Sequence, residues 1–244
     1  MFDLKKWQVK LKKCQIKLRK FNILRKKEPG GPPFALPQTI SGTLHQTVLM
    51  IERLAEIRHY SFALASCQHC AGTTSLTWSL ARIFSEITDK EIVIVEANMN
   101  TPILGQVLGL DEKPGFHEFV SGYENLDEVV QQPGGERFSV ITAGDCDSSH
   151  RKILSQPNLE RALLKIRDRF EITIVDTAPL LIYPDTLSLA GSLDGLILVL
   201  KAESDEWEVA KLAKRAASDT GTNIVGAILN RKPLYIPDWL YQRL

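Results

Sequence analysis

The chain has 244 residues, of which 44% are hydrophobic and 24% charged, and its formal net charge is +1. These values are typical of a folded globular protein and exclude a disordered or collagen-like chain. The longest apolar run, Leu196–Leu200, is too short to span a bilayer, the N-terminus lacks the apolar core of a signal peptide, and four cysteines are too few for a disulfide framework, so we expect a cytoplasmic protein.

The N-terminal arm is strongly basic. Residues 1–30 contain eleven basic and two acidic residues, a charge of +9, whereas the rest of the chain carries −8. Apolar side chains recur in the arm every three or four residues, which predicts a helix with one apolar face. These side chains are Leu4, Trp7, Leu11, Cys14, Leu18 and Phe21. Because Pro29–Pro33 ends any helix, we divide the chain into an arm with a Pro/Gly linker, residues 1–38, and a single α/β domain, residues 39–244.

A basic amphipathic helix favours a position at the inner face of the membrane, with residues 1–28 on an anionic lipid surface. Docking on a partner protein, pairing with a second copy and a solvated tail are the alternatives. We do not expect nucleic acid as a partner, because the arm has no recognised reading motif.

Beyond the linker, apolar segments alternate with amphipathic ones. In chain order we expect a helix at Ile40–Arg58, a strand at Ser61–Ser66, a helix at Thr73–Glu86, a strand at Glu91–Val95, helical segments at Pro102–Leu108, Phe116–Ser121 and Leu126–Gln131, a strand at Arg137–Thr142, a helix at Asn158–Phe170, a strand at Ile172–Val175, a helix at Thr186–Ala190, a strand at Gly195–Leu200, a helix at Glu206–Thr220 and a strand at Asn223–Leu229.

Apolar strands between amphipathic helices predict a three-layer α/β domain, with a mainly parallel sheet covered on both faces. We expect Glu91–Val95 and Ile172–Val175 among the neighbours of the first strand, Ser61–Ser66. In such sheets ligands bind at the carboxyl ends of the strands.

The segment after the first strand is similar to a P-loop, G-x-x-x-x-G-K-[ST], whose amides, lysine and hydroxyl hold phosphates and Mg²⁺. Gly72 and Thr74 stand where the second glycine and the hydroxyl belong, but Thr73 stands where the lysine belongs. The match is too weak to use alone.

The order of further motifs makes the match specific. SCQHCAGTTS is followed by LTWSLAR, then EANMNTP and VLGL, ITAG, IVDTAP and finally ILNR. Over about residues 40–232 this order resembles the P-loop ATPase domain of the bacterial tyrosine kinase and capsular exopolysaccharide family, relatives of the MinD/ParA group. The resemblance implies a P-loop NTPase-like fold, with ATP and Mg²⁺ as cofactors of intact members.

The resemblance assigns roles to individual residues. Asp176 is the acid of the third strand, Thr74 the P-loop hydroxyl and Asn230 the residue that contacts adenine. Several positions depart from the family: Thr73 replaces the lysine, Cys70 replaces the first P-loop glycine, and Glu96 and Asn98 replace the Asp-x-Asp pair. The charges of the family's ring contacts are absent near Thr43, Gln46 and Leu49, and the tyrosine cluster of the tail is reduced to Tyr235 and Tyr241.

Phosphoryl transfer depends on positioning and charge neutralisation, so these departures predict a catalytically degenerate relative. We expect a regulatory partner of a membrane polysaccharide co-polymerase or exporter, with weakened binding of ATP and Mg²⁺, and we leave a homo-oligomer open. The alternative is an active ATPase or tyrosine kinase with a non-standard P-loop.

The cysteines give a third, weaker reading. Cys67 and Cys70 form a C-x-x-C at the strand-to-helix turn, and Cys146 and His150 follow another strand. Both loops lie on the same edge of a parallel sheet, so these four residues are a candidate zinc set, or the two loop cysteines a redox pair. The alternative without a function is that the cysteines are small residues that fill a degenerate phosphate loop.

Overall fold

The structure is a computed structural model, and it describes residues 59–145 and 157–231. The arm, the expected helix Ile40–Arg58, the ring-contact positions and the C-terminal tyrosines lie outside these residues. The elements are β1 Tyr60–Ser66, α3 Thr73–Ile87, β2 Ile92–Glu96, α4 Leu104–Leu108, α5 Phe116–Ser121, α6 Leu126–Val129, β3 Val130–Gln131, β4 Ser139–Ile141, α7 Pro157–Arg169, β5 Ile172–Asp176, α8 Asp185–Gly191, β6 Gly195–Lys201, α9 Trp207–Asp219 and β7 Ile224–Asn230.

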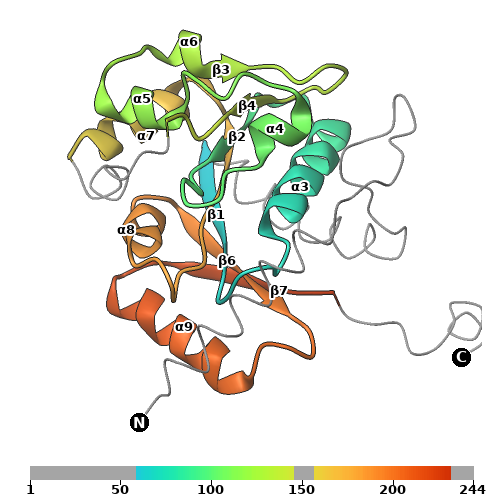
Figure 1. The fold of residues 1–244 in the computed structure, drawn as a ribbon, viewed down its shortest axis with the longest axis vertical. Helices are drawn as coiled ribbons and strands as arrows, with labels where there is room; N and C mark the ends of the chain where they lie inside the picture. Colours follow the sequence, from blue (N-terminus) through green and yellow to red (C-terminus); the bar gives the residue numbers. More distant parts are fainter. Residues whose placement is uncertain (1–58, 146–156, 232–244) are drawn as a thin grey trace, which may run out of the picture.

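The strands form one seven-stranded sheet in the order β3-β4-β2-β5-β1-β6-β7 (Figure 1). All neighbouring pairs are parallel except β3 and β4, which confirms the expected mainly parallel sheet. Of the two expected neighbours of β1, only β5 pairs with it directly, because β2 lies one strand further away, beside β5.

The edge strand β3 was not expected. The segment Leu126–Gln131, predicted as helical, is helical only to Val129, and its last two residues pair antiparallel with β4. Val130 lies opposite Ile141, and Gln131 lies opposite Val140. A two-residue pairing depends on the partner strand, so the local apolar pattern does not reveal it.

Helices cover both faces of the sheet, as Figure 1 shows, with α3 and α4 on one face and α5, α7, α8 and α9 on the other. On the first face the indole of Trp78 packs edge-on against Phe138, with ring centroids 4.9 Å apart. Every residue of β1, β2 and β5 is buried, which explains their uninterrupted apolar runs. No helix among residues 59–145 and 157–231 has the length and apolar character that crossing a membrane requires.

The register of the central strands gathers the candidate site at one edge of the sheet. Glu96, the last residue of β2, lies opposite Asp176, the last residue of β5. Asp176 in turn lies opposite Leu64 of β1, two residues before the loop that leads to α3. The carboxyl ends of β1, β2 and β5 therefore meet where ligands bind in sheets of this type.

Candidate functional site

The loop between β1 and α3 has the backbone of a phosphate-binding turn. Cys70 and Gly72 both have a positive φ, 64° and 89°, and α3 begins directly afterwards at Thr73. A Cβ atom at Gly72 would lie 2.7 Å from the side-chain nitrogen of Asn230, so no larger residue fits there. Cys70 takes a conformation that costs a non-glycine residue about 1–2 kcal/mol.

Thr74 and Asp176 form a direct pair beneath this loop. The Thr74 hydroxyl donates to Oδ2 of Asp176 at 2.6 Å, and the carboxyl is completely buried. Its other oxygen, Oδ1, has no hydrogen-bond partner among the described residues. Burial raises the pKa of Asp176 to about 7, opposed by the hydrogen bond from Thr74 and reinforced by the nearby Glu96 carboxylate.

Glu96 is bound by the protein's own backbone. One of its carboxylate oxygens accepts hydrogen bonds from the amides of Ile103 and Leu104, at 2.6 and 2.8 Å, and the other accepts one from the amide of Ala143, at 3.2 Å. Burial raises the pKa of Glu96, and these backbone bonds oppose the rise. The carboxylate therefore fastens the start of α4 and the segment after β4 to the end of β2.

Asn98 does not join the Thr74–Asp176 pair. Its amide donates to the hydroxyl of Thr101 at 3.1 Å, within the turn that follows β2. The two positions that the resemblance matches to an Asp-x-Asp pair are thus both engaged in local structure.

Asn230, at the end of β7, closes the loop from the other side. Its Nδ2 donates to the carbonyl of Ala71 at 2.7 Å, and its Oδ1 accepts the amide of Arg231 at 2.8 Å. The residue that we expect to contact adenine therefore also holds the phosphate-like loop. The side chain of Arg231 is close as well, since its Nε lies 3.9 Å from the position of a Cβ on Gly72.

Arg231 is a candidate site residue that the sequence analysis missed. The signal was present, because Arg231 directly follows Asn230 in the ILNR motif. The loop itself, Ser66–Ser75, contains no lysine or arginine, and burial lowers the pKa of its single histidine, His69. Among the described residues, Arg231 is thus a cationic side chain that the fold brings beside Gly72 of the loop.

The loop cysteines differ in their surroundings. Cys67 is completely buried, which raises the pKa of its thiol to about 12, with the Asp205 carboxylate adding to the rise. A protonated, buried thiol is a poor redox group or metal ligand. Cys70 is half-buried, while Cys146 and His150 lie outside the described residues. Within the part of the chain that the structure describes, no cluster of three or more metal-ligating side chains occurs.

The residues fit a magnesium ion better than a triphosphate. Thr74 and the partnerless Oδ1 of Asp176 supply the hydroxyl and carboxylate oxygens that Mg²⁺ prefers. The phosphate side lacks the lysine that neutralises the β- and γ-phosphates, and Asn230 is bonded to the loop. When bound, Mg-ATP supplies the phosphoryl group in this class of site, and Thr74 and Asp176 would hold its metal.

The buried Asp176 makes the stability of the fold depend on pH. Its pKa of about 7 exceeds the ordinary value of 3.8, so the folded state holds the proton more tightly than the unfolded state does. The stabilisation is complete below about pH 4 and is lost as the pH rises through 7. The free energy of unfolding of the wild type should therefore fall by on the order of 4 kcal/mol between these pH values because of Asp176 alone. Asp176→Asn cannot titrate, so this part of the fall should be absent in the variant.

Urea unfolding of both proteins at pH 4 and pH 8 measures this difference. Asp219→Asn, on the exposed end of α9, is the matched control and should keep the wild-type pH dependence. An unchanged pH dependence in Asp176→Asn would contradict the burial of an ionisable carboxyl at this position.

Comparison with known proteins gives distant relatives, several of which are named tyrosine-protein kinases. No family model matches the chain. It is 25% identical over 160 residues to the tyrosine-protein kinase Etk of Escherichia coli K12, covering 66% of this chain and 22% of Etk. It is 22% identical over 200 residues to the tyrosine-protein kinase YwqD of Bacillus subtilis, covering 81% of this chain and 84% of YwqD. The uncharacterized ATP-binding protein MJ0547 of Methanocaldococcus jannaschii is 31% identical over 176 residues, 70% of this chain and 64% of that protein.

Solved structures agree on the fold. The kinase domain of Escherichia coli Etk superimposes with a TM-score of 0.70 and 20% identity, covering 77% of this chain and 75% of that domain. The cobyrinic acid a,c-diamide synthase of Mycobacterium smegmatis, solved with an ATP analogue and magnesium, gives a TM-score of 0.60 at 20% identity, covering 71% and 77% of the two chains.

The chain spans about a fifth of Etk but most of YwqD. The chain is therefore a distant homologue of bacterial tyrosine kinases such as Etk and YwqD, and it has the P-loop NTPase fold that MinD/ParA-type proteins share.

Proposed function

We propose that this chain is a non-catalytic relative of the capsular exopolysaccharide tyrosine kinases, and that it regulates a membrane polysaccharide co-polymerase or exporter. In this proposal the chain has lost phosphoryl transfer but has kept the fold of the kinase domain. A regulatory subunit needs a folded surface that its partner recognises and a means of reaching that partner, but it does not need to hydrolyse ATP.

The engagement of Glu96 carries this proposal. A carboxylate that assists magnesium or the attacking hydroxyl has to face the phosphate loop. The Glu96 carboxylate is bound instead by the amides of Ile103, Leu104 and Ala143. Freeing it would leave buried amides without acceptors, at about 1–3 kcal/mol for each group.

The charge of the loop supports the same conclusion. Thr73 has no positive charge to offer a γ-phosphate, and Asn98 cannot act as a base. Loss of one such electrostatic contact typically costs a catalyst about 3–4 kcal/mol of transition-state stabilisation. Two losses together leave little of the rate enhancement.

A nucleotide-binding protein with unusual residues is the second candidate, and Arg231 favours it. Its guanidinium lies beside Gly72, where it can approach a phosphate, and Thr74 and Asp176 retain the oxygens for a metal. The relative MJ0547 carries the name of an ATP-binding protein. Binding without turnover is compatible with a regulatory role, whereas magnesium-dependent turnover is not.

Turnover and binding separate the two candidates. We expect the wild-type chain to show no magnesium-dependent ATP hydrolysis and no autophosphorylation above the level of Asp176→Ala. Thr73→Lys restores the missing charge and should raise the affinity for a fluorescent ATP analogue by about tenfold or more, the worth of one charged hydrogen bond. Equilibrium titration with and without Mg²⁺ measures the affinity.

Ser218→Lys adds the same charge to an exposed position of α9, away from the loop, and should leave the affinity at the wild-type level. Wild-type turnover that disappears in Asp176→Ala would overturn the non-catalytic proposal and favour an active ATPase or kinase.

The arm supports a membrane location in the same proposal. Its charge of +9 attracts anionic lipid at roughly 1 kcal/mol for each basic residue near the surface, and the apolar stripe adds burial. We propose that residues 1–28 hold the protein at the inner face of the membrane, next to its partner.

Co-sedimentation of the full chain with vesicles tests the arm. Replacing Trp7 and Phe21 by Ala should weaken binding to vesicles rich in anionic lipid at any salt concentration, because it removes the apolar contribution. Raising the salt should weaken binding of both proteins, since exposed charges are screened beyond about 10 Å at 0.1 M.

The control replaces two exposed aromatic residues of the folded domain, Tyr123 and Trp207, by Ala. Equal sedimentation of the arm variant and this control would exclude insertion of the arm and leave docking on a protein as its role.

A further inference from the structure

The ends of β6 and β7 place basic residues beside the loop between β1 and α3. Lys201, the last residue of β6, lies opposite Asn230, the last residue of β7. Residues paired in this way direct their side chains to the same face of a sheet. The Asn230 side chain reaches the loop, since its Nδ2 donates to the carbonyl of Ala71 at 2.7 Å. Lys201 therefore lies on the side of the sheet that carries the loop.

Arg231 approaches the same loop from the end of β7. Its backbone is left-handed, with a φ of 57°, and its amide donates to Oδ1 of Asn230 at 2.8 Å. Left-handed conformations are unfavourable for residues other than glycine, and they persist where the surrounding structure holds them, often at binding sites. In this conformation the Nε of Arg231 lies 3.9 Å from the position of a Cβ on Gly72.

The charges of Lys201 and Arg231 are not neutralised by a carboxylate of the described chain. Within residues 59–145 and 157–231, neither side chain forms a salt bridge. Asp205 lies close to Lys201, but its carboxylate accepts the backbone amide of Lys201 at 2.7 Å rather than the ammonium group. The positive charge of both side chains is therefore available to a ligand.

The loop supplies the other half of an anion site. Gly72 has a left-handed backbone, and the 15-residue helix α3 begins at Thr73, so the first amides of this helix and its dipole favour a phosphate. A second observation points to a ligand at the same place, because Oδ1 of the completely buried Asp176 has no hydrogen-bond partner among the described residues. Together with the Thr74 hydroxyl, which donates to the other oxygen of Asp176, it suits the metal ion that accompanies a nucleotide phosphate.

We propose that Arg231 and Lys201 supply the positive charge that holds the phosphate groups of a nucleotide at this loop. A P-loop lysine has that role in an intact site, and Thr73 stands in its place here. The guanidinium of Arg231 matches phosphate oxygens in a bidentate manner, and Lys201 adds a point charge. The inference rests on the nucleotide-binding candidate of the proposed function and deepens it, because it names the cations of that site and requires no turnover.

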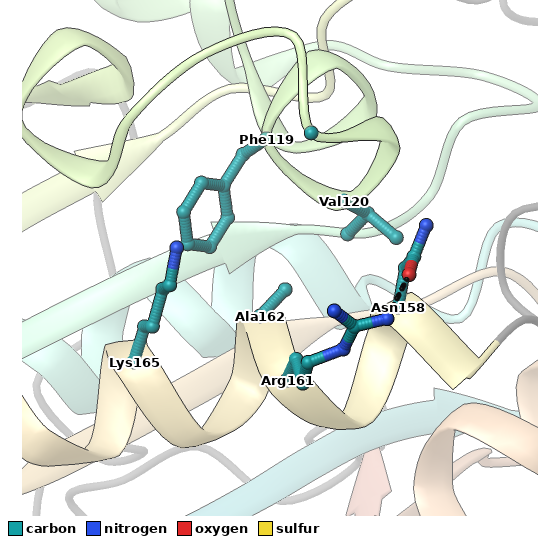
Figure 2. Close-up of a pocket in the computed structure, with 7 residues that line it drawn as sticks. Phe119, Val120, Asn158, Arg161, Ala162 and Lys165 are labelled. Carbon is teal, nitrogen blue, oxygen red and sulfur yellow. Dashed lines mark hydrogen bonds between the residues drawn. The ribbon is translucent and has the colours of Figure 1, made fainter.

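Arg161 and Lys165 of α7 provide a matched comparison. Arg161 is also an exposed arginine near the start of a helix, where its Nη2 donates to Oδ1 of Asn158 at 2.8 Å (Figure 2). It lines a pocket with Lys165, on the face of the sheet opposite α3, and no carboxylate belongs to that lining. These two residues carry the same charges as Arg231 and Lys201, but without the left-handed turn or the buried carboxylate of the loop.

Competition binding to the full chain tests the inference. A fluorescent ATP analogue is bound in the presence of Mg²⁺ and displaced by ADP, or by adenosine, which has no phosphate. We expect ADP to bind the wild type more tightly than adenosine does. Arg231→Gln removes the charge but keeps most of the length of the side chain, and it should weaken ADP binding about tenfold without changing adenosine binding. Lys201→Gln should weaken ADP binding by a smaller factor, because an ammonium makes no bidentate contact.

Returning a lysine to the loop provides a rescue. Thr73→Lys in the Arg231→Gln background should restore ADP affinity to the wild-type level, and the gain should exceed that of Thr73→Lys alone, because both cations serve the same phosphates. The controls Arg161→Gln and Lys165→Gln should keep the wild-type affinity. The basic arm is present in every variant, so a difference between variants reports on the loop, and thermal unfolding checks that each variant is folded.

Equal ADP affinity in Arg231→Gln and Arg161→Gln would overturn the role of Arg231. A loss that is the same for ADP and adenosine would assign Arg231 to the base or ribose and contradict a phosphate contact. If the wild type shows no saturable binding, the inference fails while the non-catalytic proposal stands. Turnover that disappears in Asp176→Ala has the opposite effect, so the two failures are distinguishable.

Discussion

The carboxylate of Glu96 holds together the edge of the sheet on which the candidate site depends. A buried carboxylate is strongly unfavourable without hydrogen-bond donors, and three backbone amides supply them here. Two of these amides begin α4 and the third follows β4, so one side chain positions a helix and a strand end relative to β2. The hydrogen bonds of Glu96 fix the ends of these strands. Around the strand ends lie the loop, the Thr74–Asp176 pair and Asn230.

At the same edge, the turn between β1 and α3 is held by contacts between polar groups of the protein itself. Gly72 keeps the left-handed turn and the close approach to Asn230 that the loop requires. Thr74 and Asp176 are bonded to each other, and Asn230 is bonded to Ala71. These contacts pair the Thr74 hydroxyl, one oxygen of Asp176 and the Asn230 amide within the protein, whereas Oδ1 of Asp176 has no hydrogen-bond partner among the described residues.

The sequence predicted most of the elements, because each central strand is an apolar run bounded by polar residues. It missed β3, whose pairing depends on β4, and it placed β2 beside β1 because local patterns do not determine strand order. At the site, motif order located Thr74 and Asp176 together, but no local pattern could show that Glu96 bonds to Ala143, 47 positions along the chain. The cation beside Gly72 also comes from a distant segment, Arg231.

Urea unfolding of Glu96→Asp, with and without Mg-ATP, tests the central claim most directly. Aspartate keeps the charge but is one methylene shorter, so it cannot reach the three amides. We predict that the free energy of unfolding falls by about 1–3 kcal/mol for each amide that loses its acceptor and that Mg-ATP does not restore it. The contrary result is that Glu96→Asp is as stable as the wild type and is stabilised further when Mg-ATP is added. This result would show a nucleotide site that accepts an aspartate, and it would contradict a purely structural role of Glu96.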